Sequence, residues 1–216
     1  MINNQNYYQD IIDYKLDLLG NKIQFLASKL VRDSIDLDKI SSDFYQINIY
    51  YNVELFDKEV SKYVFYPLLN DRFRHIIWTY KERIVKEEVY DLFGKLLYTY
   101  SFINLENIDK LNVYSLKKKI YCKKLILPHY NGFKVIYAKC DKNQRHIVYS
   151  DGLNKFSFFR QHYMLDIPEE ERIVFGNYVY SVKKNNHLYL VVGTIPFREM
   201  HKIVNKYIKE AMNEES

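Results

Sequence analysis

Histidines, carboxylates and one serine are the side chains of this sequence that could carry chemistry, as metal ligands, proton carriers or a nucleophile. Ser150 lacks the G-x-S-x-G turn in which hydrolases hold a nucleophilic serine. The acidic residues gather beside turn signals, where charge is usually solvated surface; they are Glu87, Glu88, Asp91, Glu169, Glu170 and Glu171. The histidines form neither an i, i+4 pair nor a set with paired cysteines; they are His75, His129, His146, His162, His187 and His201. We therefore expect no enzymatic activity, no cofactor and no metal site.

Cys122 and Cys140 are the two cysteines of the chain. A turn centred near Asn131-Gly132 would make the flanking strands antiparallel and bring the two cysteines opposite each other. Opposed cysteines can approach disulfide distance, although cross-strand geometry is often strained. In a cytosolic chain we expect both thiols to be reduced instead. The pattern therefore indicates a cross-strand pair and leaves its redox state open.

The stretch from His146 to Phe159 carries the clearest structural signal. Residues 147–149 have high β-propensity, Ser150-Asp151-Gly152 supplies a tight turn, and three phenylalanines follow. This arrangement predicts a β-hairpin.

Alternation of apolar and polar residues from Phe44 onward predicts two antiparallel sheets. The first is a meander of strands over residues 44–55, 59–68, 73–81 and 84–105, with its last turn at 91–94. A short turn of helix is expected within residues 36–43. The second sheet has strands over residues 133–140, 146–150, 156–161, 173–184 and 187–195. A helix from Pro196 to about Asn213 follows, and it places one apolar face on the sheet: Met200, Ile203, Val204, Tyr207, Ile208 and Met212.

Five aromatic side chains alternate along the first predicted sheet. Such a set is typical of core packing, and it can also line a groove for a lipid tail or an apolar peptide. Both interpretations stay open from the sequence for Phe44, Tyr51, Phe65, Trp78 and Tyr98.

The chain has 216 residues, 48% of them apolar, so one sizeable core or two small ones are expected. Its net charge of +5 combines interspersed charges of both signs, which bears on solubility more than on partners. The main basic run, Lys117-Lys118-Lys119 with Lys123 and Lys124, fits a solvated linker over residues 115–124. The same run could face nucleic acid, so a cytoplasmic nucleic-acid-binding protein is one alternative function.

No stretch of the sequence reaches the roughly 18 consecutive apolar residues of a membrane-spanning helix. The N-terminal segment has no positively charged start, and Asp10, Asp13 and Asp17 interrupt what would be its apolar core. It is therefore not a signal peptide, and these residues alone predict a cytoplasmic or truncated product.

Four short motifs resemble segments of one protein family, in the family's order. Residues 146–159 resemble H-x-V-Y-S-D-G-L-x-x-x-S-x-F, and residues 191–196 resemble V-V-G-x-x-P. Leu127-Pro128 with Gly132-Phe133 is similar to L-P-x-G-F, and residues 67–102 resemble P-x-D-x-x-R-Y-x-x-x-L-W-x-D followed by L-L-D-x-x-G-x-x-L-x-x-F-x-F. The family is MucB/RseB, envelope regulators of extracytoplasmic sigma factors. The resemblance runs from about Asp43 to the C-terminus and includes no catalytic signature.

The resemblance implies an α+β fold: a partial LolA-like half-barrel sheet over residues 1–114, the linker, and a small sheet with a C-terminal helix over residues 125–216. It also favours strands over an amphipathic helix in residues 1–32, with a turn at Gly20-Asn21. Because the recognisable part begins late, we expect an N-terminally incomplete relative with an open sheet edge, prone to association.

The function implied by the resemblance is non-catalytic regulation in the periplasm or cell envelope. The chain would bind the extracytoplasmic part of a membrane-anchored anti-sigma factor and sense a lipid or lipoprotein, with no nucleic acid; a homo-oligomer is left open. The expected partner contacts are the helix and an exposed surface at Tyr149, Ser150, Asp151, Gly152 and Leu153. A lipid or lipoprotein carrier of the LolA/LolB type is the other alternative, although such a carrier lacks the small domain.

Overall fold

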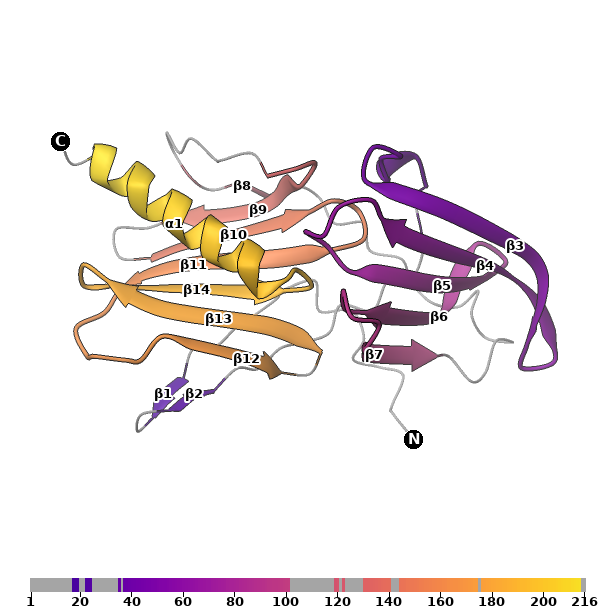
Figure 1. Ribbon diagram of the computed structural model, residues 1–216, viewed down its shortest axis with the longest axis horizontal. Coiled ribbons are helices and arrows are strands. Elements are labelled where there is room, and N and C mark those ends of the chain that lie inside the picture. The colour runs from indigo at the N-terminus through magenta and orange to yellow at the C-terminus, as the bar shows by residue number, and fades with distance from the viewer. Residues whose placement is uncertain are drawn as a thin grey trace.

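The computed structural model describes residues 17–19, 22–24, 35, 37–101, 119–120, 122, 130–140, 144–174 and 176–214. Within these residues the chain forms two larger sheets that lie side by side, antiparallel apart from one parallel pair in the second, and one helix crosses a face of the second sheet (Figure 1). This confirms the predicted order of two sheets and a C-terminal helix. The half-barrel curvature of the first sheet and the domain limits at 114 and 125 remain predictions.

The five-stranded sheet is the meander that the alternation predicts. Its strands pair in chain order, and they are β3 (Tyr45–Leu55), β4 (Lys58–Pro67), β5 (Arg74–Tyr80), β6 (Arg83–Tyr90) and β7 (Leu96–Ser101). The 3-10 turn η1 (Leu37–Lys39) precedes it, inside the expected short helix. The short strands β1 (Asp17–Leu19) and β2 (Lys22–Gln24) pair with each other, which supports strands over a helix there. The turn predicted at Gly20-Asn21 lies outside the described residues.

Three two-residue turns join neighbouring strands with positive φ at both turn residues. Phe56-Asp57 connects β3 to β4, and Lys81-Glu82 connects β5 to β6. Asn185-Asn186 connects the last two strands of the second sheet. Positive φ at both positions suits the right-handed twist of a hairpin. Asparagine and aspartate tolerate positive φ, so the residue type favours this conformation at Asn185-Asn186 and at Asp57. At Phe56 and at Lys81-Glu82 it does not, and there the turn follows from the pairing of the strands.

The second sheet has seven strands in the order β12-β13-β14-β11-β10-β9-β8. They are β8 (Lys119–Ile120), β9 (Lys134–Cys140), β10 (Gln144–Ser150), β11 (Lys155–His162), β12 (Glu170–Val174), β13 (Asn177–Lys184) and β14 (His187–Gly193). The single strand predicted over residues 173–184 is wrong, because the chain turns at Gly176, whose φ is +76°, and the two halves pair as β12 and β13.

The strand β8 corrects two predictions. Residues 119–120 were assigned to the linker over residues 115–124, yet they belong to the second sheet. They pair with β9 in parallel, so the antiparallel hairpin predicted around Asn131-Gly132 is wrong. A turn does occur there, since the Phe133 amide donates to the Tyr130 carbonyl. Parallel pairing needs a crossover of about a dozen residues, and the segment between β8 and β9 is long enough to supply it.

The helix α1 (Phe197–Glu214) packs on the second sheet as predicted. Met200, Ile203, Val204 and Tyr207 are buried in the core that α1 shares with this sheet. The Tyr207 ring stacks on Phe158 with ring centroids 3.8 Å apart. Its hydroxyl lies 2.6 Å from the Tyr149 hydroxyl, so both polar groups are satisfied inside an apolar layer.

The core of the second sheet continues into the first. Phe73 and Val89 of the first sheet are buried in the same cluster as Tyr178 and Met200. In the opposite direction Leu153, from the turn between β10 and β11, is buried among residues of the first sheet. Each sheet therefore completes the core of the other.

Candidate functional site

The turn between β10 and β11 is built around Asp151. Its Oδ1 accepts hydrogen bonds from the backbone amides of Leu153, at 2.9 Å, and Asn154, at 2.7 Å. An aspartate that binds the amides following it stabilises a turn without help from the rest of the fold. Gly152 has a φ of +99°, a conformation that glycine adopts without steric cost. The sequence thus fixes this turn locally.

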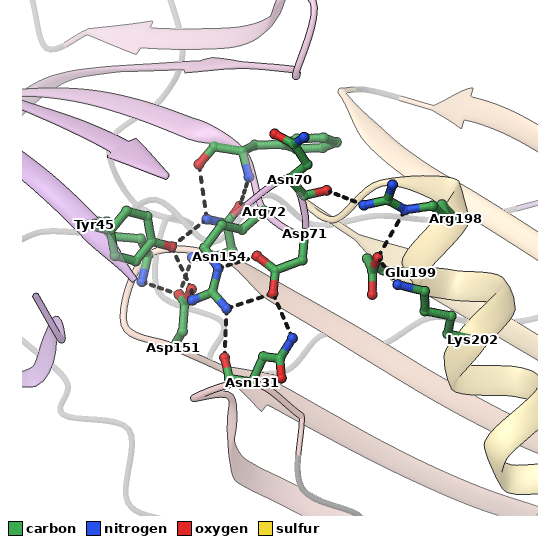
Figure 2. A network of polar contacts seen from close by, with 12 residues as sticks. Tyr45, Asn70, Asp71, Arg72, Asn131, Asp151, Asn154, Arg198, Glu199 and Lys202 are labelled. Carbon is green, nitrogen blue, oxygen red and sulfur yellow. Dashed lines mark hydrogen bonds and ion pairs between the residues drawn. The ribbon is translucent and has the colours of Figure 1, made fainter. Parts of the chain in front are cut away.

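The second oxygen of Asp151 faces the first sheet. Its Oδ2 accepts from the Tyr45 hydroxyl, at 2.5 Å, and from Nη1 of Arg72, at 3.0 Å. Tyr45 begins β3 and Arg72 lies in the loop before β5. A single carboxylate therefore ties its own turn to two segments of the other sheet (Figure 2).

Arg72 is fully buried, and its guanidinium contacts carboxylates, a backbone carbonyl and aromatic rings. Its Nε and Nη2 form a two-pronged ion pair with Asp71, at 2.7 and 3.0 Å. Nη2 also donates to the backbone carbonyl of Asn131, at 2.6 Å. The rings of Phe44 and Phe133 lie 4.3 and 5.0 Å from the guanidinium carbon. Arg72 is thus bound from both sheets, by carboxylates within its plane and aromatic rings over it.

Asn154 completes the network with three contacts to the first sheet. Its Oδ1 accepts from the Phe73 amide, and its Nδ2 donates to the Phe73 carbonyl, both at 3.2 Å. Nδ2 also donates to the Tyr45 hydroxyl, at 2.8 Å. We call Tyr45, Asp71, Arg72, Asp151 and Asn154 the polar junction.

Burial and charge shift the pKa values of this junction. Burial, and then the charge and hydrogen bond of Asp151, raise the pKa of Tyr45 well above its usual value. Burial raises the pKa of Asp71, but the hydrogen bond and charge of Arg72, and then the hydrogen bond of Asn131, outweigh burial, so that the net pKa is lowered. Tyr45 is therefore held protonated and Asp71 ionised. These groups are already bound to each other, so the arrangement holds two sheets together and offers no free acid, base or nucleophile.

Asp91 makes a second contact of the same kind between the two sheets. Asp91 accepts the amides of Phe93 and Lys95 through Oδ1, both at 2.9 Å, and the Tyr178 hydroxyl through Oδ2, at 3.3 Å. Tyr178 also packs edge-on against Phe73, with ring centroids 4.9 Å apart. Arg198 of α1 adds a further contact, since its Nη2 donates to the Asn70 carbonyl at 3.2 Å (Figure 2).

The predicted surface at residues 149–153 is largely wrong. Tyr149, Ser150, Asp151 and Leu153 are buried, and only Gly152 is exposed. The cause is the side-by-side packing of the sheets, which places this turn inside the molecule. Partner binding through these residues stays a prediction, and from the surface only Gly152 could take part in it.

The five aromatic residues predicted to line a cavity do not converge. Phe44 packs in the cluster that contains Phe65, and Tyr98 packs in the adjoining core. Trp78 lies on the opposite face of the first sheet, because Phe65 pairs with His75 and Trp78 is an odd number of residues further along β5. Tyr51 is exposed. The prediction of a groove lined by all five residues is therefore wrong.

The two cysteines are bonded to each other, with Cα atoms 5.0 Å apart. That separation is ordinary for a disulfide. The sequence predicted that Cys122 and Cys140 face each other across antiparallel strands, but β8 and β9 are parallel. In the parallel register Lys119 pairs with Tyr137 and Ile120 with Ala138, and the same offset of 18 residues separates the cysteines.

Sequence reasoning missed Tyr45, Asp71, Arg72 and Asn154. A signal for Arg72 was present, since it lies inside the segment from Pro67 to Phe102 that carries the family resemblance. Asn154 follows directly on the turn motif. Nothing local marks Tyr45 among the 22 tyrosines of the chain.

Two kinds of feature are absent from the described part of the chain, a metal-binding cluster and a membrane-spanning helix. Among the described side chains, no three His, Cys, Asp or Glu residues gather as a metal ion would require. Within the same part of the chain, no helix has the length and apolar character needed to cross a bilayer.

Comparison with solved structures shows which known fold this chain resembles. The crystal structure of MucB in complex with MucA(peri) has a TM-score of 0.50 at 15% identity, covering 72% of this chain and 64% of that one. The crystal structure of MucB gives 0.50 at 16% identity, covering 75% and 62%. The chain is similar in fold to MucB. The complex structure of Pseudomonas aeruginosa MucA/MucB gives 0.48 at 14% identity, covering 72% and 61%.

The likeness to MucB is one of fold, and the chain spans less than two thirds of the length of each of these MucB structures. No protein family matches the sequence, and no curated protein matches it. The resemblance drawn from the four motifs is therefore confirmed at the level of fold. Membership of the MucB/RseB family stays a prediction.

Proposed function

We propose that this chain is a non-catalytic regulator of the MucB kind. It binds the extracytoplasmic part of a membrane-anchored anti-sigma factor, shields that part from proteolysis, and releases it when a lipid or lipoprotein signal arrives. The observation that carries the proposal is the fold, since the similar structure of MucB was solved in complex with MucA(peri). The saturated polar junction supports a role in binding rather than catalysis.

The junction also suggests how a signal in one sheet reaches the other. Leu153 is buried in the first sheet beside Phe65 and Ile77. It lies two residues after Asp151, whose carboxylate accepts the Leu153 amide. In this proposal an apolar chain that enters the cluster displaces Leu153, and the displacement pulls on the turn at Asp151, which holds Arg72. The signal would thus loosen the contact between the sheets.

The partner surface in this proposal is the second sheet with α1. This part of the chain cannot be tested alone, because residues 1–114 supply Phe73 and Val89 to its core. The experiment therefore uses the full chain.

An oxidising compartment fits the proposed location in the cell envelope. The bond between Cys122 and Cys140 is of the kind that persists in the periplasm and is rare in the cytosol. This support is independent of the fold comparison.

Site-specific photo-crosslinking in the native cell tests the proposed function. A benzophenone side chain replaces Met164 or Leu165, both exposed beside the second sheet, and in the matched control it replaces the exposed Phe93 of the first sheet. We expect adducts from the first two positions with a single-span membrane protein whose cytoplasmic part retains a sigma factor. Adducts with lipoproteins alone would favour a carrier, and adducts with cytosolic proteins alone would place the chain in another compartment; both contradict the proposal.

A further inference from the structure

The strand β3 forms an edge of the first sheet. It pairs with β4 on one side, and no described strand pairs with its other side. Ile49, Tyr50 and Tyr51 are 39%, 47% and 69% exposed. A long edge strand with consecutive exposed apolar residues is a template for pairing with another chain. The register with β4 is regular from Tyr45 to Tyr50 and shifts only beyond it, so about six residues offer a straight edge.

Next to this edge, a row of cations and rings crosses one face of the same sheet. Tyr50 pairs with Lys62, Lys62 with Trp78, and Trp78 with Lys86. The Lys86 and Lys62 ammonium groups lie 4.4 and 5.2 Å from the centre of the Trp78 ring. Lys62 also lies 5.9 Å from the centre of the Tyr50 ring, at the free edge. Positive charge is thereby held in place against rings.

The charge of this face is strongly unbalanced. The register places five described cations on it and one described carboxylate, Glu88, which pairs with Lys86 at 2.7 Å. The cations are Lys58, Lys62, Arg74, Arg83 and Lys86. A face with this excess of cations complements an acidic partner.

Three kinds of partner could meet such a surface, and the structure favours one. Trp78 is only 7% exposed beneath its two lysines, so it offers no face on which a nucleic-acid base could stack. A second copy paired along β3 would bring two copies of the Lys62 row together, and like charges repel. An extended acidic polypeptide satisfies both the unpaired edge and the cations.

We propose that β3 binds an extended acidic segment of another protein as an added strand, whose side chains on one face reach Lys62 and the row behind it. This docking surface goes beyond the proposed regulatory function and does not depend on it, since it does not involve the second sheet and its exposed residues, Ile49 to Tyr51, lie beyond Tyr45 of the polar junction. The contacts of the edge supply affinity through main-chain hydrogen bonds, and the cations select for acidic side chains.

Fluorescence anisotropy on the purified full chain tests this surface. The probe is a labelled dodecapeptide of alternating glutamate and threonine, with the lysine–threonine peptide as its counterpart. We expect the acidic peptide to bind, with an affinity that falls as salt rises, and the basic peptide not to bind. The same acidic peptide with every amide N-methylated cannot add as a strand, because both of its edges lose their donors, and equal binding of that peptide would overturn the proposal.

Charge-reversal variants locate the site. Lys62→Glu with Lys86→Glu should weaken binding of the acidic peptide by roughly tenfold or more, because two attractive pairs become repulsive. The matched control, Lys139→Glu with Lys184→Glu on the second sheet, makes the same change in net charge at two exposed positions and should leave binding unchanged. Equal losses in both variants would show a general charge effect and overturn the site.

Two other outcomes would also overturn the proposal. Tighter binding of an oligothymidylate than of the acidic peptide would assign the face to nucleic acid. A concentration-dependent dimer that Tyr51→Lys abolishes would assign the edge to a second copy of the chain. Near-ultraviolet circular dichroism confirms that each variant is folded before its binding is compared.

Discussion

Asp151 and Asp91 hold equivalent positions in the two sheets. Each uses Oδ1 to accept two amides of its own turn and Oδ2 to accept a tyrosine hydroxyl from the other sheet. The tyrosines are Tyr45 for Asp151 and Tyr178 for Asp91. The carboxylates thus form the local turns and also join the sheets, which explains why changes at these points should act on the whole fold.

Arg72→Met should be among the most destabilising substitutions. It leaves the carboxylates of Asp71 and Asp151 without their cation in a buried setting. Removing one partner of a buried ion pair costs about 3–5 kcal/mol of unfolding free energy. The midpoint of urea unfolding measures the loss. Lys184→Met, at an exposed cation of β13, is the control and should change the free energy by no more than about 0.5 kcal/mol; similar losses at both sites would show that the junction is not specially stabilising.

Gly132 and Gly94 form a matched pair of glycines. Their φ angles are +78° and +80°, but a Cβ on Gly132 would lie 2.2 Å from the Phe44 ring, whereas a Cβ on Gly94 meets nothing within 4 Å. Gly94→Ala should cost about 1–2 kcal/mol for the backbone conformation alone, and Gly132→Ala about 1–3 kcal/mol more for the clash. Thermal unfolding compares them. Equal costs would mean that Phe44 does not press against this turn.

The polar junction should weaken in alkaline solution. The pKa of Tyr45 is raised above its usual 10.0 in the folded protein, first by burial and then by Asp151. A raised pKa means that the contribution to stability is complete below about pH 10 and is lost as the pH rises above it. Unfolding free energy measured from pH 8 upward should fall more steeply for the wild type than for Tyr45→Phe. Parallel curves would contradict the assignment.

His146 should make the protein sensitive to acid. Burial, and then the charge of Lys139, lower its pKa from 6.5 to about 4. A lowered pKa means that stability is complete above about pH 6.5 and is lost as the pH falls towards 4, by up to about 3 kcal/mol. NMR titration of the imidazole should give a midpoint near the lowered value. His146→Gln should remove this part of the acid sensitivity, and a midpoint near 6.5 would refute the prediction.

The bond between Cys122 and Cys140 closes a loop with a sequence separation of 18 residues. A disulfide that closes a loop of this length should stabilise the fold by about 3 kcal/mol, because it reduces the conformational entropy of the unfolded chain. Replacing both cysteines by serine, or adding reductant, should lower the unfolding free energy by that amount. Thiol counting on protein from its native compartment decides the redox state. Two free thiols there would exclude both the bridge and the support it gives to an envelope location.

The strands and the helix could be predicted from sequence because their signals are local. The alternation from Phe44 to Ser101 marks one buried face of the meander, and the spacing of Met200, Ile203 and Tyr207 marks one buried face of α1. The turn at Asp151 was also predictable, since an aspartate binds the amides that follow it. Each of these depends on residues within a few positions of one another.

The polar junction depended on contacts that no local pattern contains. Tyr45 and Asp151 are separated by 106 positions in the chain, and Arg72 and Asp151 by 79. Alternation gives the buried face of each sheet but not the neighbour against which it packs, so the turn at residues 149–153 was expected on the surface. The direction of β8 was equally undetermined, because a short strand can pair either way and the crossover decides.

The sequence by itself therefore determined the elements and the turn at Asp151, whereas the register that brings Cys122 to Cys140 came from the structure. Only the tertiary structure decided that the two sheets share a core, that Trp78 and Phe65 occupy opposite faces, and that the edge of β3 is exposed beside a row of cations. The physical reason is that local hydrogen bonding and side-chain periodicity act over a few residues, whereas burial of an arginine such as Arg72 depends on carboxylates and rings that reach it from distant segments.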